Sequence, residues 1–313
     1  MTLALLAMSH SPLLEFADLQ TDVTAELDQT FAAARDFVQD YDPDVVVNLA
    51  PDHYNGFFYN LMPPYCIGYA ARSIGDYGSR AGRLDVPEDK ARMLAEAVIA
   101  DGIDLSVSLE MEVDHGTVQP MEIVYGDITA KPFIPIFINS VAPPFTPVKR
   151  VRKLGEAIGR HLSTWEEKVL LISSGGLSHD PPVPRLATAT PSQRAMLMGE
   201  TQPLPADARA ARQQRVIDAA REFAAGAADI QDLAPEWDRA LLRILASGDL
   251  TPVDAFDPDE MTRIAGNSSH EVRTWIAGYA AMAATGPYTV QHSYYRPIRE
   301  LIAGFAMTTV THD

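Results

Sequence analysis

Hydrophobic positions in the first half of the chain follow two alternating patterns. Short continuous apolar runs that end at polar residues predict buried strands at residues 3–8, 45–49, 105–109, 133–138 and 169–172. Apolar residues three and four positions apart predict helices at residues 22–40, 87–100 and 148–162. A strand followed by a helix, several times over, is typical of an α/β fold with a central β-sheet flanked by helices.

The second half of the chain has a different pattern. From about residue 205 it is mostly helical and rich in alanine, over residues 206–228, 235–246 and 270–284. The six prolines between residues 180 and 205 predict a long loop or lid. Because no repeat or low-complexity linker divides the chain, we expect a single domain over residues 1–313 with a helix-rich part from about 205.

The charge of the chain restricts its partners. Asp and Glu number 42 against 25 Lys and Arg, which gives a formal net charge of −17. Such a surface repels nucleic acid and anionic lipid, so we expect neither as a partner. An acidic substrate would need a local cation, and Arg185 in the predicted lid and Arg296 near the C-terminus are candidates.

Two further features concern targeting and metal chemistry. The N-terminal residues lack the basic region of a signal peptide, and the apolar stretch at 275–290 is too short to span a bilayer, so we expect a cytoplasmic protein. Cys66 is the single cysteine, which excludes a disulfide framework and a thiolate-rich metal site. Any bound metal must therefore be held by His, Asp or Glu.

Three histidines directly follow predicted strands. His10 follows the first strand, His53 the second, and His179 the strand at 169–172 through a Gly-Gly turn. Ligands of open α/β sheets bind at the carboxyl ends of the strands, so these imidazoles converge on one crevice if the strands are parallel neighbours. The alternative for each is a loop histidine hydrogen-bonded to the backbone.

Two more residues are candidates for the same site. His115 lies in a polar, turn-forming sequence beyond the strand at 105–109, where a surface loop histidine is the alternative. Glu271 lies at the start of a predicted helix, where an acidic side chain can also stabilise the helix dipole. His270 is adjacent to Glu271 and points about 100° away on a helix, so the two are not expected to bind one ion.

Six motifs give the chain a resemblance to a known family. They are MSHSPL at 8–13, APDHYN at 50–55, VDHG at 113–116, SGGLSHD at 174–180, residues 267–275, and the tail at 294–305. Through these motifs the chain resembles the class III, LigB-like extradiol dioxygenases over nearly its whole length. The resemblance implies the LigB-like extradiol dioxygenase fold.

The resemblance also implies the roles of the candidate residues. His10, His53 and Glu271 would bind Fe(II), while His115 and His179 would handle protons. Two imidazoles and one carboxylate form the facial triad of non-haem Fe(II) oxygenases, which leaves positions for a catechol and O2. Because histidine exchanges protons near neutral pH, we assign the base to His179 and the acid to His115, and the two roles could be exchanged.

The activity implied by the resemblance is extradiol cleavage of a catechol in the catabolism of aromatic compounds, by a homo-oligomer. The favoured substrates are 3-(2,3-dihydroxyphenyl)propanoate and 2,3-dihydroxycinnamate, with another 3-substituted catechol as an alternative. A zinc-bound water on the same residues would instead give a hydrolase. A non-enzymatic protein similar to Memo is the third possibility, and the presence of all five candidate residues argues against it.

Overall fold

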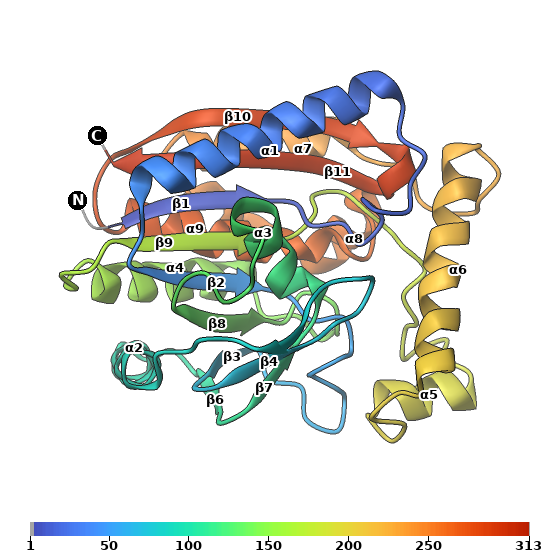
Figure 1. The fold of residues 1–313 in the computed structure, drawn as a ribbon, viewed down its shortest axis with the longest axis horizontal. Helices are drawn as coiled ribbons and strands as arrows, with labels where there is room; N and C mark the ends of the chain where they lie inside the picture. The colour runs from blue at the N-terminus through green and yellow to red at the C-terminus, as the bar shows by residue number, and fades with distance from the viewer. Residues whose placement is uncertain (1–2, 313) are drawn as a thin grey trace.

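An eight-stranded mixed sheet forms the centre of the computed structural model, which describes residues 3–312 (Figure 1). The strand order is β10-β11-β1-β9-β2-β8-β3-β6, and a second sheet has the order β5-β4-β7. The strands are β1 (Leu3–Met8), β2 (Val45–Ala50), β3 (Tyr65–Gly68), β4 (Ala71–Ile74), β5 (Ala81–Arg83), β6 (Ser106–Ser108), β7 (Met111–Val113), β8 (Phe133–Ile138), β9 (Val169–Ser174), β10 (Tyr288–Ile298) and β11 (Ala303–His312).

Strands β1, β9, β2 and β8 are parallel neighbours in the middle of this sheet. All of their residues are buried, as expected for parallel strands covered on both faces. Their carboxyl ends meet at one edge of the sheet, on the right of Figure 1. The predicted α/β architecture is therefore confirmed, and the loops after β1, β2 and β9 leave the sheet at the same edge.

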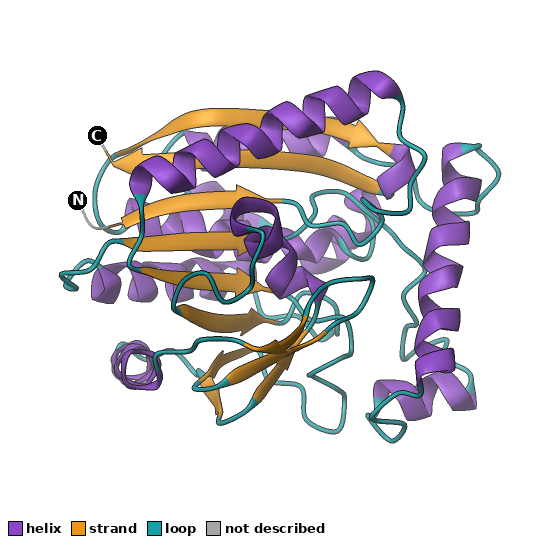
Figure 2. Cartoon of the chain, viewed as in Figure 1, coloured by secondary structure: helices purple, strands orange, loops and turns teal. Residues whose placement is uncertain are grey.

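Helices cover both faces of the sheet (Figure 2). They are α1 (Thr21–Tyr41), α2 (Glu88–Ala100), α3 (His115–Tyr125), α4 (Val148–Leu162), α5 (Pro191–Leu197), α6 (Ala206–Ala224), α7 (Pro235–Ala246), α8 (Pro258–Ala265) and α9 (Val272–Ala283), with short 3-10 helices η1 (Thr251–Ala255), η2 (Ser269–Glu271) and η3 (Arg299–Leu301). Alternate residues of β1 enter two cores: Leu5 packs in the core that includes α4 and α9, and Leu6 packs in the core that includes α1 and α3. No helix in residues 3–312 is long and apolar enough to cross a membrane.

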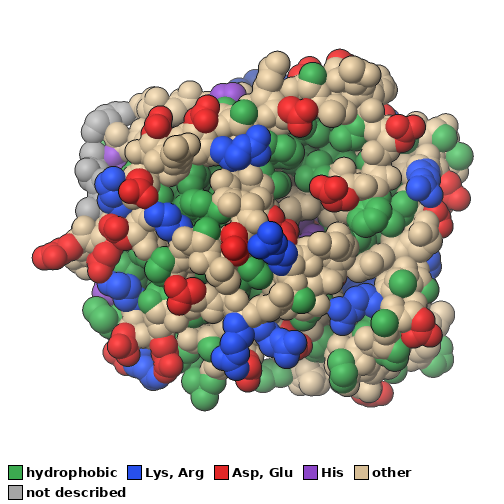
Figure 3. Space-filling view, in the orientation of Figure 1, with side chains coloured by type: hydrophobic (Ala, Val, Ile, Leu, Met, Phe, Trp, Pro, Cys, Tyr) green, Lys and Arg blue, Asp and Glu red, His purple; other side chains and the backbone are tan. Residues whose placement is uncertain are grey.

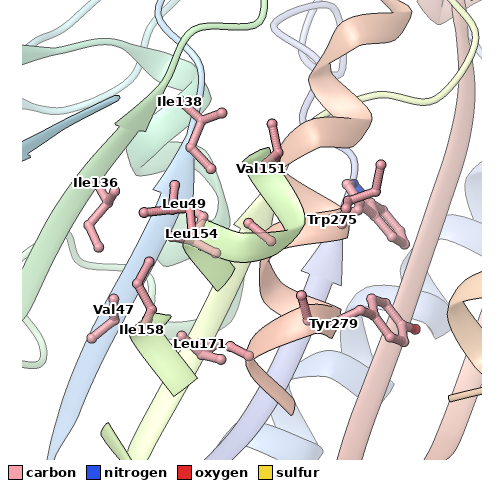
Figure 4. Close-up of a cluster of buried hydrophobic side chains, with 14 of the residues drawn as sticks. Val47, Leu49, Ile136, Ile138, Val151, Leu154, Ile158, Leu171, Trp275 and Tyr279 are labelled. Carbon is pink, nitrogen blue, oxygen red and sulfur yellow. The ribbon is translucent and has the colours of Figure 1, made fainter. Parts of the chain in front are cut away.

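Helices α4 and α9 pack closely against each other and against the sheet. Val151, Leu154 and Ile158 of α4 lie over the strands, beside Trp275 and Tyr279 of α9 (Figure 4). A Cβ added at Gly155 of α4 would lie 2.1 Å from the carbonyl oxygen of Ala277 in α9. Only glycine permits the two helix backbones to come this close. The close contact fixes α9, the helix that follows Glu271, against the core.

The C-terminal part differs from the prediction in one respect. Helices α6 to α9 confirm its helix-rich character, but β10 and β11 form a long antiparallel hairpin, and β11 pairs with β1. Most of β11 is buried, and its mixture of Ala, Gly and Thr shows no alternation of polar and apolar residues. The proline-rich segment contains α5, and α6 lies beyond the carboxyl ends of the parallel strands (Figure 1).

Candidate active site

The five predicted site residues lie together at the carboxyl edge of the sheet. Glu271 is their centre: its Oε1 lies 3.1 Å from Nε2 of His53 and 3.2 Å from Nε2 of His179. Its Oε2 lies 3.5 Å from Nε2 of His10. The rings of His10 and His115 have centroids 5.4 Å apart, which places the fourth imidazole beside the other three. Side chains from positions far apart in the sequence thus form one buried cluster.

His10 is held in a defined tautomer by Ser174 at the end of β9. The Ser174 hydroxyl donates to the carbonyl oxygen of Gly116 at 2.5 Å and lies 2.9 Å from Nδ1 of His10. Since the hydroxyl proton is already used, the imidazole donates from Nδ1, and Nε2 carries the lone pair. Burial lowers the pKa of His10 to about 3, so the ring is neutral and suited to ligate a metal.

His53 is oriented by Asp114, which precedes α3. The Asp114 carboxylate lies 3.0 Å from Nδ1 of His53 and accepts its backbone N–H at 2.8 Å. Burial acts to lower the pKa of His53, but Asp114 and Glu271 outweigh it and raise that pKa well above its usual value. A carboxylate behind a ligating histidine is a common support of metal sites, because it fixes the ring and increases its basicity.

Glu271 occupies the N-cap position of α9, but its side chain makes no capping hydrogen bond. Its Oε2 accepts the backbone N–H of Gly176 at 2.9 Å, in the turn after β9, and its side chain is 1% exposed. Burial acts to raise the pKa of this carboxyl, but the surrounding histidines lower it well below its usual value. The adjacent His270 points elsewhere, as predicted: it stacks on Phe145 with ring centroids 3.9 Å apart and pairs with Thr262.

In both predicted proton-transfer residues a hydrogen bond holds Nδ1, and Nε2 is turned towards the site, where that of His179 lies 3.2 Å from Oε1 of Glu271. His179 donates from Nδ1 to the carbonyl oxygen of Leu177 at 2.8 Å. His115 is the first residue of α3 and is buried, which excludes a surface loop, and its Nδ1 lies 2.5 Å from Oδ2 of Asp76. In both residues Nε2 is therefore the atom that can exchange a proton with a ligand.

A cavity of about 360 Å³ opens onto this cluster. All five residues line it, together with residues of the proline-rich segment and of α6. Acidic and basic side chains are interspersed over the face in Figure 3, where a histidine is visible within a recess. The cavity is large enough for a substituted aromatic ring.

The donor set fits a metal ion. Nε2 of His10, Nε2 of His53 and the Glu271 carboxylate provide two nitrogens and one oxygen, with both histidines supported at Nδ1. The imidazoles of His10, His53 and His115 are also close enough to share an ion. However, the His115 ring is stacked on that of His53 at an interplanar angle of 18°, so their in-plane lone pairs do not converge. Glu271 is the better third ligand.

Comparison with known proteins identifies the family. Residues 4–306 match the family described as "Catalytic LigB subunit of aromatic ring-opening dioxygenase". The chain belongs to the LigB family. This confirms the resemblance seen in the six motifs, and it makes the protein a ring-cleaving dioxygenase of a metal-dependent family.

Curated members of the LigB family are similar over nearly the whole chain. A "2,3-dihydroxyphenylpropionate/2,3-dihydroxicinnamic acid 1,2-dioxygenase" of Rhodococcus globerulus is 58% identical over 98% of this chain and 97% of its own. Proteins with the same name from Rhodococcus rhodochrous and Mycolicibacterium gilvum are 56% and 54% identical, over 99% and 98% of this chain and 98% and 97% of theirs. An uncharacterized protein, JW3007 from Escherichia coli K12, has a solved structure with a TM-score of 0.52 at 14% identity, covering 99% of both chains, which supports the fold alone.

Several residues of this LigB-family site have no role predicted from the sequence. Asp114 and Ser174 lie within the motifs. Each is a polar residue next to the end of a strand, and this position was the signal that could have indicated their role in the site. Asp76 lies far from His115 in the sequence, so no spacing indicates their contact. Of the two predicted arginines, Arg185 lines the cavity and pairs with Asp180 at 3.4 Å, whereas Arg296 lies outside it and pairs with Asp22 at 2.9 Å.

Proposed function

We propose that this protein is an Fe(II)-dependent extradiol dioxygenase that opens 3-(2,3-dihydroxyphenyl)propanoate and 2,3-dihydroxycinnamate beside their hydroxyls, with incorporation of both atoms of O2. The observation that carries the proposal is the Glu271 carboxylate, which lies within 3.5 Å of Nε2 of His10 and within 3.1 Å of Nε2 of His53. Names of relatives at 54–58% identity support the substrate.

In this proposal His10, His53 and Glu271 hold the metal. Bound Fe(II) supplies the redox chemistry that allows O2 to react with an electron-rich ring. The protein supports that ion by holding Nδ1 of both histidines, through Ser174 and Asp114, and by burying His10 and Glu271 away from bulk water.

His179 and His115 are proposed to move the protons. Nδ1 of His179 donates to a backbone carbonyl, so its Nε2 can accept a proton from a catechol hydroxyl. Asp76 holds Nδ1 of His115, which leaves Nε2 of that ring to donate a proton as the ring opens. His115 reaches the cavity from the start of α3 and His179 from the segment after β9, so in this proposal base and acid act on different oxygens.

The chain is further proposed to act as one catalytic domain over residues 1–313, as a cytoplasmic homo-oligomer. Pairing of β11 with β1 brings the last strand beside the first and supports the single domain. Light scattering after size-exclusion chromatography tests the oligomer.

Anaerobic loading with Fe(II), followed by O2 and a panel of 3-substituted catechols, tests the activity. We expect one O2 consumed per ring opened, with the propanoate and acrylate substrates preferred. A product formed after loading with Zn²⁺ alone, without consumption of O2, would favour a hydrolase, and no reaction with any catechol would favour a non-enzymatic protein.

A further inference from the structure

A row of three arginines from α6 lines the same cavity as the imidazole cluster. Arg209, Arg212 and Arg215 are three residues apart, which places them on neighbouring positions of one helix face. Helix α6 lies beyond the carboxyl ends of the parallel strands (Figure 1), and all three arginines line the cavity.

None of these arginines forms an ion pair within residues 3–312, although the chain carries 42 acidic residues against 25 basic ones. Arg209 donates to the carbonyl oxygen of Ile74 at 3.2 Å, and Arg212 donates to that of His53. The guanidinium of Arg215, an exposed residue, has no hydrogen-bond partner in the described part of the chain. A guanidinium has five N–H donors, so the row retains unused donors at the cavity wall.

Tyr77 lies beside His115 at the reacting end of the cavity and also lines it. Its ring lies 5.1 Å from that of His115 between centroids. Burial raises the pKa of the Tyr77 hydroxyl to about 12, and the nearby charges of Arg212 and Arg215 act in the opposite direction. Arg212 and Arg215 are therefore within electrostatic reach of a side chain that contacts the proton-transfer site.

Apolar side chains form another part of the cavity wall. Leu13, Val183, Val216 and Ile302 contribute to it. The cavity thus combines a cluster of imidazoles and a carboxylate, an apolar wall, and a set of unpaired cations. A molecule complementary to all three is an aromatic diol with a short apolar chain that ends in an anion.

We propose that Arg215, assisted by Arg212, forms the subsite that binds the side-chain carboxylate of the substrate. Arg215 is the main contact because its guanidinium is uncommitted, and a guanidinium binds a carboxylate through two parallel hydrogen bonds. The same cations offset the repulsion that a net charge of −17 exerts on an acidic substrate. This assignment rests on the proposed dioxygenase function and adds the feature that selects among 3-substituted catechols.

The kinetic test compares Arg215→Gln and Arg215→Lys with Arg221→Gln. Arg221 is the matched control because it lies on the same helix, pairs with Asp218 at 3.3 Å and does not line the cavity. For Arg215→Gln, kcat/KM for 3-(2,3-dihydroxyphenyl)propanoate should fall about ten- to hundred-fold, mainly through KM, the loss typical of a hydrogen bond to a charged group. Its kcat/KM for 3-propylcatechol, which lacks the carboxylate, should stay near that of the wild type.

Arg215→Lys should retain part of the preference for the carboxylate, because it keeps the charge without the planar fork. Arg221→Gln should match the wild type on both substrates. An equal loss on both substrates in Arg215→Gln would indicate a structural role for Arg215 and overturn the subsite, as would unchanged discrimination.

A binding measurement separates this proposal from the proposed function. Calorimetry of the Fe(II)-loaded protein under argon, with 3-phenylpropanoate and the neutral 3-phenylpropan-1-ol, needs no ring cleavage. We expect the acid to bind more tightly than the alcohol in the wild type and to lose this advantage in Arg215→Gln. If no catechol were cleaved but this difference were found, the subsite would stand and the dioxygenase function would fail. If catechols were cleaved and the difference were missing, only the subsite would fail.

Discussion

Ser174 accepts a 2.9 Å hydrogen bond from Nδ1 of His10, and this single contact fixes which nitrogen of the imidazole is free. The serine cannot act as the donor, because its own proton goes to the carbonyl oxygen of Gly116. Nε2 of His10 is consequently unprotonated and faces Glu271. The metal-binding form of the site is thus prepared by a residue that is not itself a ligand.

Replacement of Ser174 should weaken metal binding without removing a ligand. Ser174→Ala should reduce Fe(II) affinity about ten- to hundred-fold, the usual cost of losing a supporting contact of a ligand. Ser173→Ala is the control, since the neighbouring Ser173 hydroxyl is buried and has no hydrogen-bond partner among the described residues. Competition with a chelator measures both affinities, and equal affinities in the two variants would contradict the role given to Ser174.

Loss of a proposed ligand should abolish stoichiometric metal binding. His10→Ala, His53→Ala and Glu271→Ala should each contain little iron after anaerobic loading, because two protein ligands remain. His270→Ala is the adjacent control: it should bind about one iron and be less stable, because it loses its packing on Phe145. Stoichiometric iron in Glu271→Ala would disprove the proposed triad and favour His115 as a ligand.

The proton-transfer residues should be dispensable for iron and required for turnover. His115→Gln and His179→Gln should keep near-normal iron content and lose about 10²–10⁴-fold in kcat, the range for a positioned acid or base. Metal analysis and single-turnover kinetics distinguish the two effects. Either variant turning over at close to the wild-type rate would remove that histidine from the mechanism.

Metal affinity should rise with pH. In the metal-free protein the pKa of His53 is raised by Asp114 and Glu271 despite burial, so a proton competes with the metal for Nε2. Affinity therefore increases as pH rises towards this elevated pKa and levels off above it. In Asp114→Asn the rise should move to lower pH, because one carboxylate charge is lost. Chelator competition between about pH 6 and pH 9 checks both curves; identical curves would contradict this account.

The contact between α4 and α9 should be sensitive to one methyl group. In Gly155→Ala the new Cβ would lie 2.1 Å from the carbonyl oxygen of Ala277, so a helix must shift, at a cost of about 1–3 kcal/mol in the free energy of unfolding. Lys153→Ala, at an exposed position of the same helix, should change stability little. Denaturant unfolding measures both, and equal stability of the two variants would show that α9 adjusts freely.

The strand-end histidines were predictable because each follows a short continuous apolar run, which is typical of a buried strand. His10 and His53 confirm that rule for β1 and β2, and His179 for β9. The role of Glu271 was ambiguous, because an acidic residue at the start of a helix can also stabilise the helix dipole. Only its contacts with histidines far away in the sequence decide between helix stabilisation and a role in the site.

Other features had no local signal. The contact of Asp76 with His115 depends on how the loop after β4 folds back, which hydrophobic periodicity does not encode. The β10–β11 hairpin was hidden because β11 is buried on both faces and lacks the alternation of a half-exposed strand. The arginines of α6 have an obvious helical spacing, but which surface they face is decided by tertiary packing.

The ligands proposed here are residues 10, 53 and 271, so the chelating group exists only after the central strands β1, β9 and β2 and helix α9 have assembled. Small zinc modules place their ligands a few residues apart and can begin to chelate before they fold. This chain has no such local nucleus, and its contacts of high sequence separation must form first. The rate at which the refolding chain takes up the ion would therefore follow the formation of these long-range contacts.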